Sequence, residues 1–167
     1  MKDIELRLIS ELVKNSRRSD RELAKAIGIS QPTVSRIRMR LEKQGLIDYS
    51  AVPNLAKLGF EIIAVSLGKR DYKKQPEINT QKARDFVKRY PNIIFTASGS
   101  GLGNDRILIS IHRDYSDYSK FVQEAKAEWT GWAKLDSFLI SLAGKDVVQP
   151  LSLKHFADYL KKERAPE

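Results

Sequence analysis

Cysteine is absent from the 167-residue chain, and histidine occurs only twice. Without thiols the chain can form neither disulfides nor thiolate metal sites, which is typical of a protein in a reducing cytoplasm. His112 and His155 lie far apart in the sequence, so we interpret them as a strand residue and a surface helix residue. The sequence therefore predicts no catalytic residue, no metal site and no bound cofactor.

Long apolar runs are also missing. No segment approaches the roughly 18 consecutive apolar residues that a membrane-spanning helix needs. The first ten residues, MKDIELRLIS, have the periodicity of an amphipathic helix and lack the pattern of a cleavable signal peptide. We therefore expect a cytoplasmic protein without a membrane anchor.

Basic residues outnumber acidic ones, with 30 Lys and Arg against 21 Asp and Glu, a net charge of +9 and a pI of about 9.7. Such a charge favours a polyanionic partner, either a nucleic acid or an anionic membrane surface. Acidic residues are missing between Glu22 and Glu42, whereas Lys25 and three arginines fall inside that gap. This local excess of positive charge agrees with a DNA-binding segment.

The first 50 residues show only helical periodicity. Ser19 and Glu22 match a capping box, in which each side chain satisfies a free amide at the start of a helix. Ala24 is small enough for a second helix to approach, and Gly28 tolerates the positive φ of a tight turn. The apolar residues that would join the two helices are Leu23, Ile27, Ile29, Val34 and Ile37. Together these features predict a helix-turn-helix.

The second helix of this motif would be capped by Ser30 and would carry the face that contacts DNA. Bases are usually read near the N-terminal end of such a helix, so we predict base contacts from Gln31, Thr33, Ser35 and Arg36. The residues predicted to hold phosphates are Arg40, Lys43, Arg17, Arg18 and the backbone at Ser30, with Arg38 at the edge of the face in a flanking or phosphate role. The alternative is an ordinary helical hairpin with a solvated basic face.

From residue 60 onward strands and helices alternate. Strands are predicted at residues 60–67, 93–98, 106–112 and 135–142, and helices at residues 83–90 and 118–129. The order β-α-β-β-α-β is that of a ferredoxin-like domain. Both alternating residue sets of the first strand are apolar, with Ile62 and Ala64 in one and Ile63 and Val65 in the other. Because two helices cover only one face of the sheet, the other face predicts a dimer.

Two further segments complete the predicted fold. Residues 46–53 are expected to be extended, as in a two-stranded wing. The spacing of Leu153, Phe156, Ala157 and Leu160 predicts a C-terminal helix that starts near Ser152 and docks with a solvated basic face. Such a helix could cover a sheet edge or alter the assembly. The fold class is thus α+β, with a winged helix-turn-helix at residues 1–54. A ferredoxin-like ligand-binding and oligomerisation domain with a C-terminal helical extension follows at residues 55–167.

The sequence resembles the Lrp/AsnC family of feast/famine regulators, most specifically in its first 60 residues. The resembling segments are residues 21–30, 33–38, 41–47, 49–53 and 58–59, and the order of strands and helices beyond them agrees as well. The resemblance implies a DNA-binding regulator that forms homodimers, and often tetramers or octamers, and that responds to a small effector such as an amino acid. It also implies an effector site at the turn of residues 99–105, with Gly101, Gly103 and Asp105 as candidates. The alternative for this turn is a flexible hairpin loop.

The predicted function is therefore a sequence-specific transcriptional regulator that binds double-stranded DNA and is not an enzyme. Two alternatives stay open. A branch of proteins similar to this family decarboxylates sirohaem, and His112 with the many arginines could serve a tetrapyrrole. The other alternative is an architectural protein that coats DNA with little sequence preference, which a shallow specificity ratio at fixed salt would reveal.

Overall fold

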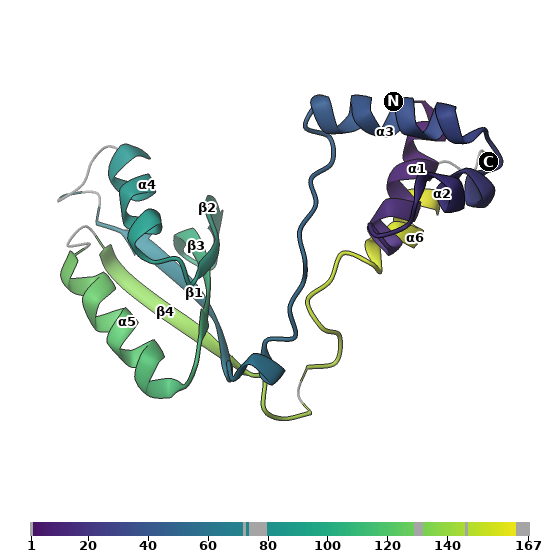
Figure 1. Ribbon diagram of the computed structural model, residues 1–167. Coiled ribbons are helices and arrows are strands. Elements are labelled where there is room, and N and C mark those ends of the chain that lie inside the picture. The colour runs from purple at the N-terminus through teal and green to yellow at the C-terminus, as the bar shows by residue number, and fades with distance from the viewer. Residues whose placement is uncertain (1, 72, 74–79, 129–131, 146, 163–167) are drawn as a thin grey trace. The chain divides into compact units, whose positions relative to one another are not determined.

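The computed structural model describes residues 2–71, 73, 80–128, 132–145 and 147–162. The chain divides into two compact units, one made of residues 1–52 and 150–167 and the other of residues 53–149 (Figure 1). The helices of the first unit are α1 (Asp3–Lys14), α2 (Asp20–Ile27), α3 (Gln31–Lys43) and α6 (Phe156–Lys162). In the described segments, no helix combines the length and the apolar character needed to cross a bilayer.

The helices α2 and α3 form the predicted helix-turn-helix. The capping box at the start of α2 is confirmed, because Glu22 N–H donates to Ser19 Oγ at 3.3 Å and Ser19 N–H donates to Glu22 Oε2 at 2.8 Å. Gly28 ends α2 with a φ of 75°, and its N–H donates to Ala24 O at 2.9 Å. The buried core of the unit consists of Leu8, Leu12, Leu23, Ala24, Ile27, Val34, Ile37 and Leu41. Because α3 turns its apolar stripe to this core, its polar face is left for solvent.

The segment after α3 differs from the prediction. Residues 46–53 form no strand, so these described residues hold no two-stranded wing. One contact opposes such a strand, because the Tyr49 hydroxyl bonds to side chains of α3 and holds this residue against the helix that precedes it. A short 3-10 helix, η1 (Ala56–Leu58), then ends at Gly59, which has a φ of 81°.

The second unit is built on an antiparallel sheet in the order β2-β3-β1-β4. Its strands are β1 (Ile62–Arg70), β2 (Ile93–Gly101), β3 (Asn104–His112) and β4 (Trp132–Ser141), and α4 (Thr80–Arg89) and α5 (Tyr115–Glu128) connect β1 to β2 and β3 to β4. In the central strand, Val65 lies opposite both Ile109 of β3 and Phe138 of β4. The predicted ferredoxin-like order is confirmed.

Both helices of this unit pack on the same face of the sheet. Phe86 of α4 and Phe121 of α5 share one buried cluster with Leu108 of β3. Because side chains alternate along a strand, the residues paired around Val65 point to the opposite face. That face is apolar and uncovered in the single chain, with Phe138 71% exposed and Phe95 50% exposed.

The C-terminal helix corrects the predicted domain boundary. It begins at Phe156, after the predicted start at Ser152, and packs on α1 of the first unit (Figure 1). Residues from 150 onward therefore group with the helix-turn-helix, whereas the prediction placed residues 55–167 in one domain. The physical reason is that Ala157, which is fully buried, lets the backbone of α6 approach α1, while Leu153 of the predicted apolar stripe is 73% exposed.

Candidate nucleic-acid interface

The helix α3 presents the four residues predicted to contact bases on its accessible face. Gln31 and Arg36 are exposed, and Thr33 and Ser35 are partly exposed. They lie in the first half of α3, the part of a recognition helix that meets base edges in other helix-turn-helix proteins. The structure thus groups these residues on one surface, and their contacts with bases stay a prediction.

Ser30 occupies the N-cap position of α3, with an extended φ of −72° and ψ of 145°, but its side chain does not cap the helix. Its Oγ lies 2.8 Å from Oγ1 of Thr33 instead, so the two hydroxyls satisfy each other. This arrangement leaves the N-terminal end of α3 without a side-chain cap. A helix N-terminus of this kind favours an anion such as a phosphate.

The basic side chains predicted to contact DNA fall into two groups. Arg17, Arg36 and Lys43 are exposed, and within the described residues they form no ion pair. The other group is held by carboxylates, and it comprises Arg18 with Glu11, Arg40 with Glu5, and Arg38 with Asp20 and Glu42. A hydrogen bond from the Lys2 backbone, and the charge of Arg40, hold the pKa of Glu5 below its usual value. The first group is the one best suited to contact DNA directly.

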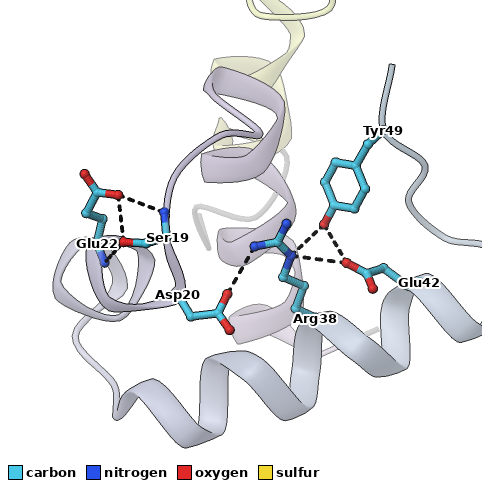
Figure 2. A network of polar contacts seen from close by, with 6 residues as sticks. All are labelled: Ser19, Asp20, Glu22, Arg38, Glu42 and Tyr49. Atoms are coloured by element: carbon cyan, nitrogen blue, oxygen red, sulfur yellow. Dashed lines mark hydrogen bonds and ion pairs between the residues drawn. The ribbon is translucent and has the colours of Figure 1, made fainter. Parts of the chain in front are cut away.

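Arg38 is the centre of a polar network that joins three parts of the unit (Figure 2). Its guanidinium lies 3.1 Å from Asp20 Oδ1 at the start of α2 and 3.2 Å from Glu42 Oε1 on α3. Its Nε donates to the Tyr49 hydroxyl at 2.9 Å, and that hydroxyl donates to Glu42 Oε1 at 2.9 Å. Arg38 therefore fastens α3 to α2 and to the segment that leaves α3.

The electrostatics of this network keep Arg38 positively charged and the Tyr49 hydroxyl protonated. Burial opposes the positive charge of Arg38, but hydrogen bonds to Asp20, Tyr49 and Glu42 raise its pKa. Burial raises the pKa of Tyr49 as well, so the phenol stays protonated and can donate to Glu42. The DNA contact predicted for Arg38 stays a prediction, and the geometry favours a positioning role for it.

The turn predicted as the effector site is a tight hairpin between β2 and β3. Gly101 and Asn104 pair across it, which leaves Leu102 and Gly103 as the turn, with φ values of 52° and 73°. Gly101 and Gly103 are exposed. Asp105 is partly buried and faces β1, where its Oδ1 accepts from Arg70 N–H at 3.2 Å and its Oδ2 lies 3.9 Å from Arg70 Nε. The three candidates thus share one hairpin, and two of them have accessible backbones.

Leu102 is poorly suited to this turn, because a branched side chain at positive φ costs about 1–2 kcal/mol. We expect Leu102→Asn to raise the free energy of unfolding of the second unit by about 1 kcal/mol, since Asn tolerates this conformation and Asn-Gly favours a two-residue hairpin. Both tryptophans of the chain lie within residues 53–149, so urea unfolding followed by tryptophan fluorescence measures this unit. Leu102→Ala is the control, and a destabilised Leu102→Asn variant would contradict the expectation.

His112, the residue weighed for tetrapyrrole chemistry, is fully buried in the second unit. Its Nε2 lies 2.8 Å from Ser110 Oγ, and its ring packs against Phe121 with centroids 5.1 Å apart and against Tyr118 at 5.4 Å. Burial lowers the pKa of His112 below its usual 6.5, and Asp117 offsets this only in part. The ring is therefore a neutral core residue with no open surface for a ligand.

This burial makes the stability of the second unit depend on pH. In the unfolded chain His112 is protonated as the pH falls through about 6.5, whereas in the folded chain it is protonated only at lower pH. The stability due to neutral His112 is thus fully present above about pH 6.5 and is lost as the pH falls below that value. We expect His112→Gln to flatten the dependence between pH 7.5 and about pH 5, measured by tryptophan fluorescence in urea. An equally steep dependence in wild type and variant would argue against this assignment.

Across the described part of the chain, no three His, Asp or Glu side chains gather closely enough to hold a metal ion. The site is thus a basic helical surface of polar side chains and backbone amides. Its chemistry is that of binding to an anionic, hydrogen-bonding partner such as DNA.

Comparisons with known proteins agree with this geometry. Residues 1–48 match a family described as winged helix-turn-helix DNA-binding. An uncharacterised HTH-type transcriptional regulator of Pyrococcus furiosus is 30% identical over 122 residues, which cover 72% of this chain and 78% of the relative. The HTH-type transcriptional regulator LrpC of Bacillus subtilis is 32% identical over 96 residues, which cover 55% of this chain and 61% of LrpC.

Solved structures show the same fold. The structure of Bacillus subtilis LrpC aligns over 84% of this chain and 94% of the LrpC chain, with 24% sequence identity and a TM-score of 0.71. A transcriptional regulator from Neisseria meningitidis was solved as a complex with L-Met. It aligns over 93% of this chain and 99% of the regulator's chain, with 17% sequence identity and a TM-score of 0.74. The chain therefore belongs to the Lrp/AsnC family of helix-turn-helix, DNA-binding transcriptional regulators.

Proposed function

We propose that this regulator binds a specific operator as a homodimer, with α3 in the major groove of each half-site. The observation that carries the proposal is the exposed guanidinium of Arg36, which has no ion-pair partner among the described residues and lies on the accessible face of α3. An arginine in this position can donate two hydrogen bonds to a guanine edge. The proposed base contacts are Gln31, Thr33, Ser35 and Arg36.

Phosphate contacts would surround this reading face. Lys43 and Arg17 are exposed and unpaired within the described residues, and the backbone at Ser30 opens the N-terminal end of α3. Arg18 adds a guanidinium that is anchored by Glu11 yet still 36% exposed. Arg40, paired with Glu5, is placed here as an outer phosphate contact, and Arg38 acts by positioning α3. These contacts would fix the register of the protein on the duplex without reading its sequence.

The dimer would form through the uncovered face of the sheet. Val65 and its neighbours Ile109 and Phe138 form a continuous apolar strip across three strands, and an exposed strip of this kind indicates a protein interface. A twofold pairing of the strips would present two copies of α3 and predicts an operator with approximate dyad symmetry. Tetramers or octamers of such dimers are the further assemblies that the family resemblance implies.

The proposed effector is an amino acid, bound near the β2–β3 hairpin. Support comes from the L-Met complex of the Neisseria regulator, which shares this fold, and from the charged pair of Asp105 and Arg70 beside the exposed backbones of Gly101 and Gly103. An acid and a base close together suit the ammonium and carboxylate of a zwitterion. A ligand that binds only the folded state raises its melting temperature, so a thermal-shift screen of amino acids tests this part.

A titration at fixed salt tests the DNA-binding part. Fluorescent duplexes from the promoter of the protein's own gene are compared with shuffled duplexes of equal length. We expect the promoter duplex to bind at least about a thousandfold more tightly, the lower end for specific regulators. Equal affinities would favour the architectural alternative. A new absorbance change with sirohaem, and no preference for any duplex, would favour the enzyme.

A further inference from the structure

The C-terminal helix α6 is the last element among the described residues, yet it packs on the first. Ser10 of α1 is fully buried and its Oγ donates to Ala157 O at 2.8 Å, across 147 residues of sequence. Lys14 Nζ lies 3.1 Å from Asp158 Oδ1. Both contacts join α6 to one face of α1, and Ala157 has no exposed surface left.

Next to these contacts, α1 also anchors Arg18, which we place at the DNA backbone. Lys14 also lies 3.7 Å from Glu11 Oε1, and Glu11 Oε2 accepts from the guanidinium of Arg18. Glu11 is only 8% exposed, so its carboxylate is a fixed anchor. Arg18 directly precedes Ser19, the N-cap residue of α2. A continuous set of polar contacts thus runs from α6 through Lys14 and Glu11 to Arg18.

The docking of α6 depends on these contacts, because the helix is short. It has seven residues, and isolated helices of this length are unstable in water. Without α6, Lys14 would lose Asp158, the Ser10 hydroxyl would lose its partner, and water would reach Glu11. Arg18 would then sample more rotamers before it meets a phosphate, and that ordering costs free energy on binding.

We infer that α6 is a positioning element for DNA binding, which holds Arg18 in place through Lys14 and Glu11. This inference rests on the proposed phosphate contact of Arg18. It also means that the DNA-binding unit is tied to the second unit at two points of the chain, through residues near 53 and residues near 150. The inference gives the C-terminal segment a role in DNA affinity that neither the helix-turn-helix pattern nor the sheet requires.

The test uses the full chain and Ala157→Gln, which adds volume at a fully buried position without changing charge or helix propensity strongly. Leu153→Gln, at a residue that is 73% exposed, is the matched control. We expect Ala157→Gln to weaken operator binding by about two- to tenfold per protomer, the cost of ordering one long side chain. The salt slope should stay that of the wild type, because the phosphate contact still forms in the complex. Leu153→Gln should bind like the wild type.

A double variant separates this route from a general loss of stability. Arg18→Ala alone should weaken binding and lower the salt slope by about 1 per protomer. If α6 acts through Arg18, then adding Ala157→Gln to Arg18→Ala should cause no further loss. The inference would be overturned if the double variant lost affinity by the product of the two single losses, or if Ala157→Gln bound the operator like the wild type. Either result would leave the phosphate contact of Arg18 intact. An unchanged salt slope in Arg18→Ala would overturn the phosphate contact itself.

Circular dichroism at the assay temperature shows that the first unit of each variant is folded. If Ala157→Gln is unfolded there, Ser10→Ala replaces it, because this change removes the hydrogen bond between α1 and α6 and leaves only a small void. We expect Ser10→Ala to weaken operator binding less than Ala157→Gln does and to keep the salt slope of the wild type. Added to Arg18→Ala, it should cause no further loss of affinity. Wild-type affinity of a folded Ser10→Ala variant would overturn the inference.

Discussion

Replacing Arg36 with alanine is expected to remove a large part of the operator preference, the part read at one guanine in each half-site. Each bidentate contact between arginine and guanine contributes about 1–3 kcal/mol of discrimination, or about 5- to 150-fold per half-site. Binding to a shuffled duplex should change far less, because Arg36 is placed to meet a base edge. Competition titrations at one salt concentration, with operator and shuffled duplexes, measure the two losses side by side.

Lys43→Ala is the matched control for that experiment. Lys43 lies at the C-terminal end of α3 and is exposed, so it is suited to a phosphate and not to a base. Its loss should weaken operator and shuffled duplexes alike and reduce the salt slope by about 1 per protomer. If Arg36→Ala and Lys43→Ala both weakened the two duplexes equally, the assignment of Arg36 to base recognition would be wrong.

Introducing a charge on the uncovered face of the sheet should break the proposed dimer. Phe138 is 71% exposed in the single chain, and burying a phenylalanine contributes about 1.5–3 kcal/mol. A twofold interface contains the residue twice, so Phe138→Arg should raise the dimer dissociation constant by at least about 10²- to 10⁴-fold. Sedimentation at micromolar concentration should show a wild-type dimer and a monomeric variant.

Tyr115→Arg is the control for Phe138→Arg. Tyr115 is 64% exposed and lies at the start of α5, on an element that packs against the opposite face of the sheet. The same change from an aromatic side chain to arginine should therefore leave the dimer intact. A dimeric Phe138→Arg variant, or a monomeric wild type, would mean that this face does not pair.

Sequence reasoning succeeded where the interactions are local. Ser19 and Glu22 are three residues apart and Gly28 ends the same helix, so their spacing alone predicted the geometry that the structure shows. The order of strands and helices followed from alternating apolar residues and from helical spacing, and it is the order of a ferredoxin-like sheet. In both cases the pattern constrains the structure without knowledge of distant contacts.

The features that the sequence did not reveal depend on contacts between distant residues. Arg38 lies at the edge of the α3 face on a helical wheel, but only the fold brings Asp20 and Tyr49 to its guanidinium. The helix α6 has an apolar pattern that fits several docking sites, and the small Ala157 opposite Ser10 selects α1. The missing wing has the same origin, because Tyr49 is drawn to Arg38 and Glu42. Sequence spacing carries no information on such pairings.

The most direct test of the account is selection of bound sites from a random duplex library, with wild-type protein at fixed salt. If a dimer reads DNA through two copies of α3, the enriched sequences should be inverted repeats with half-sites about one helical turn, roughly 10 base pairs, apart. Arg36→Ala should lose the preference at a guanine in each half-site and keep it elsewhere. Enrichment of no sequence, or of single half-sites without symmetry, would contradict the account.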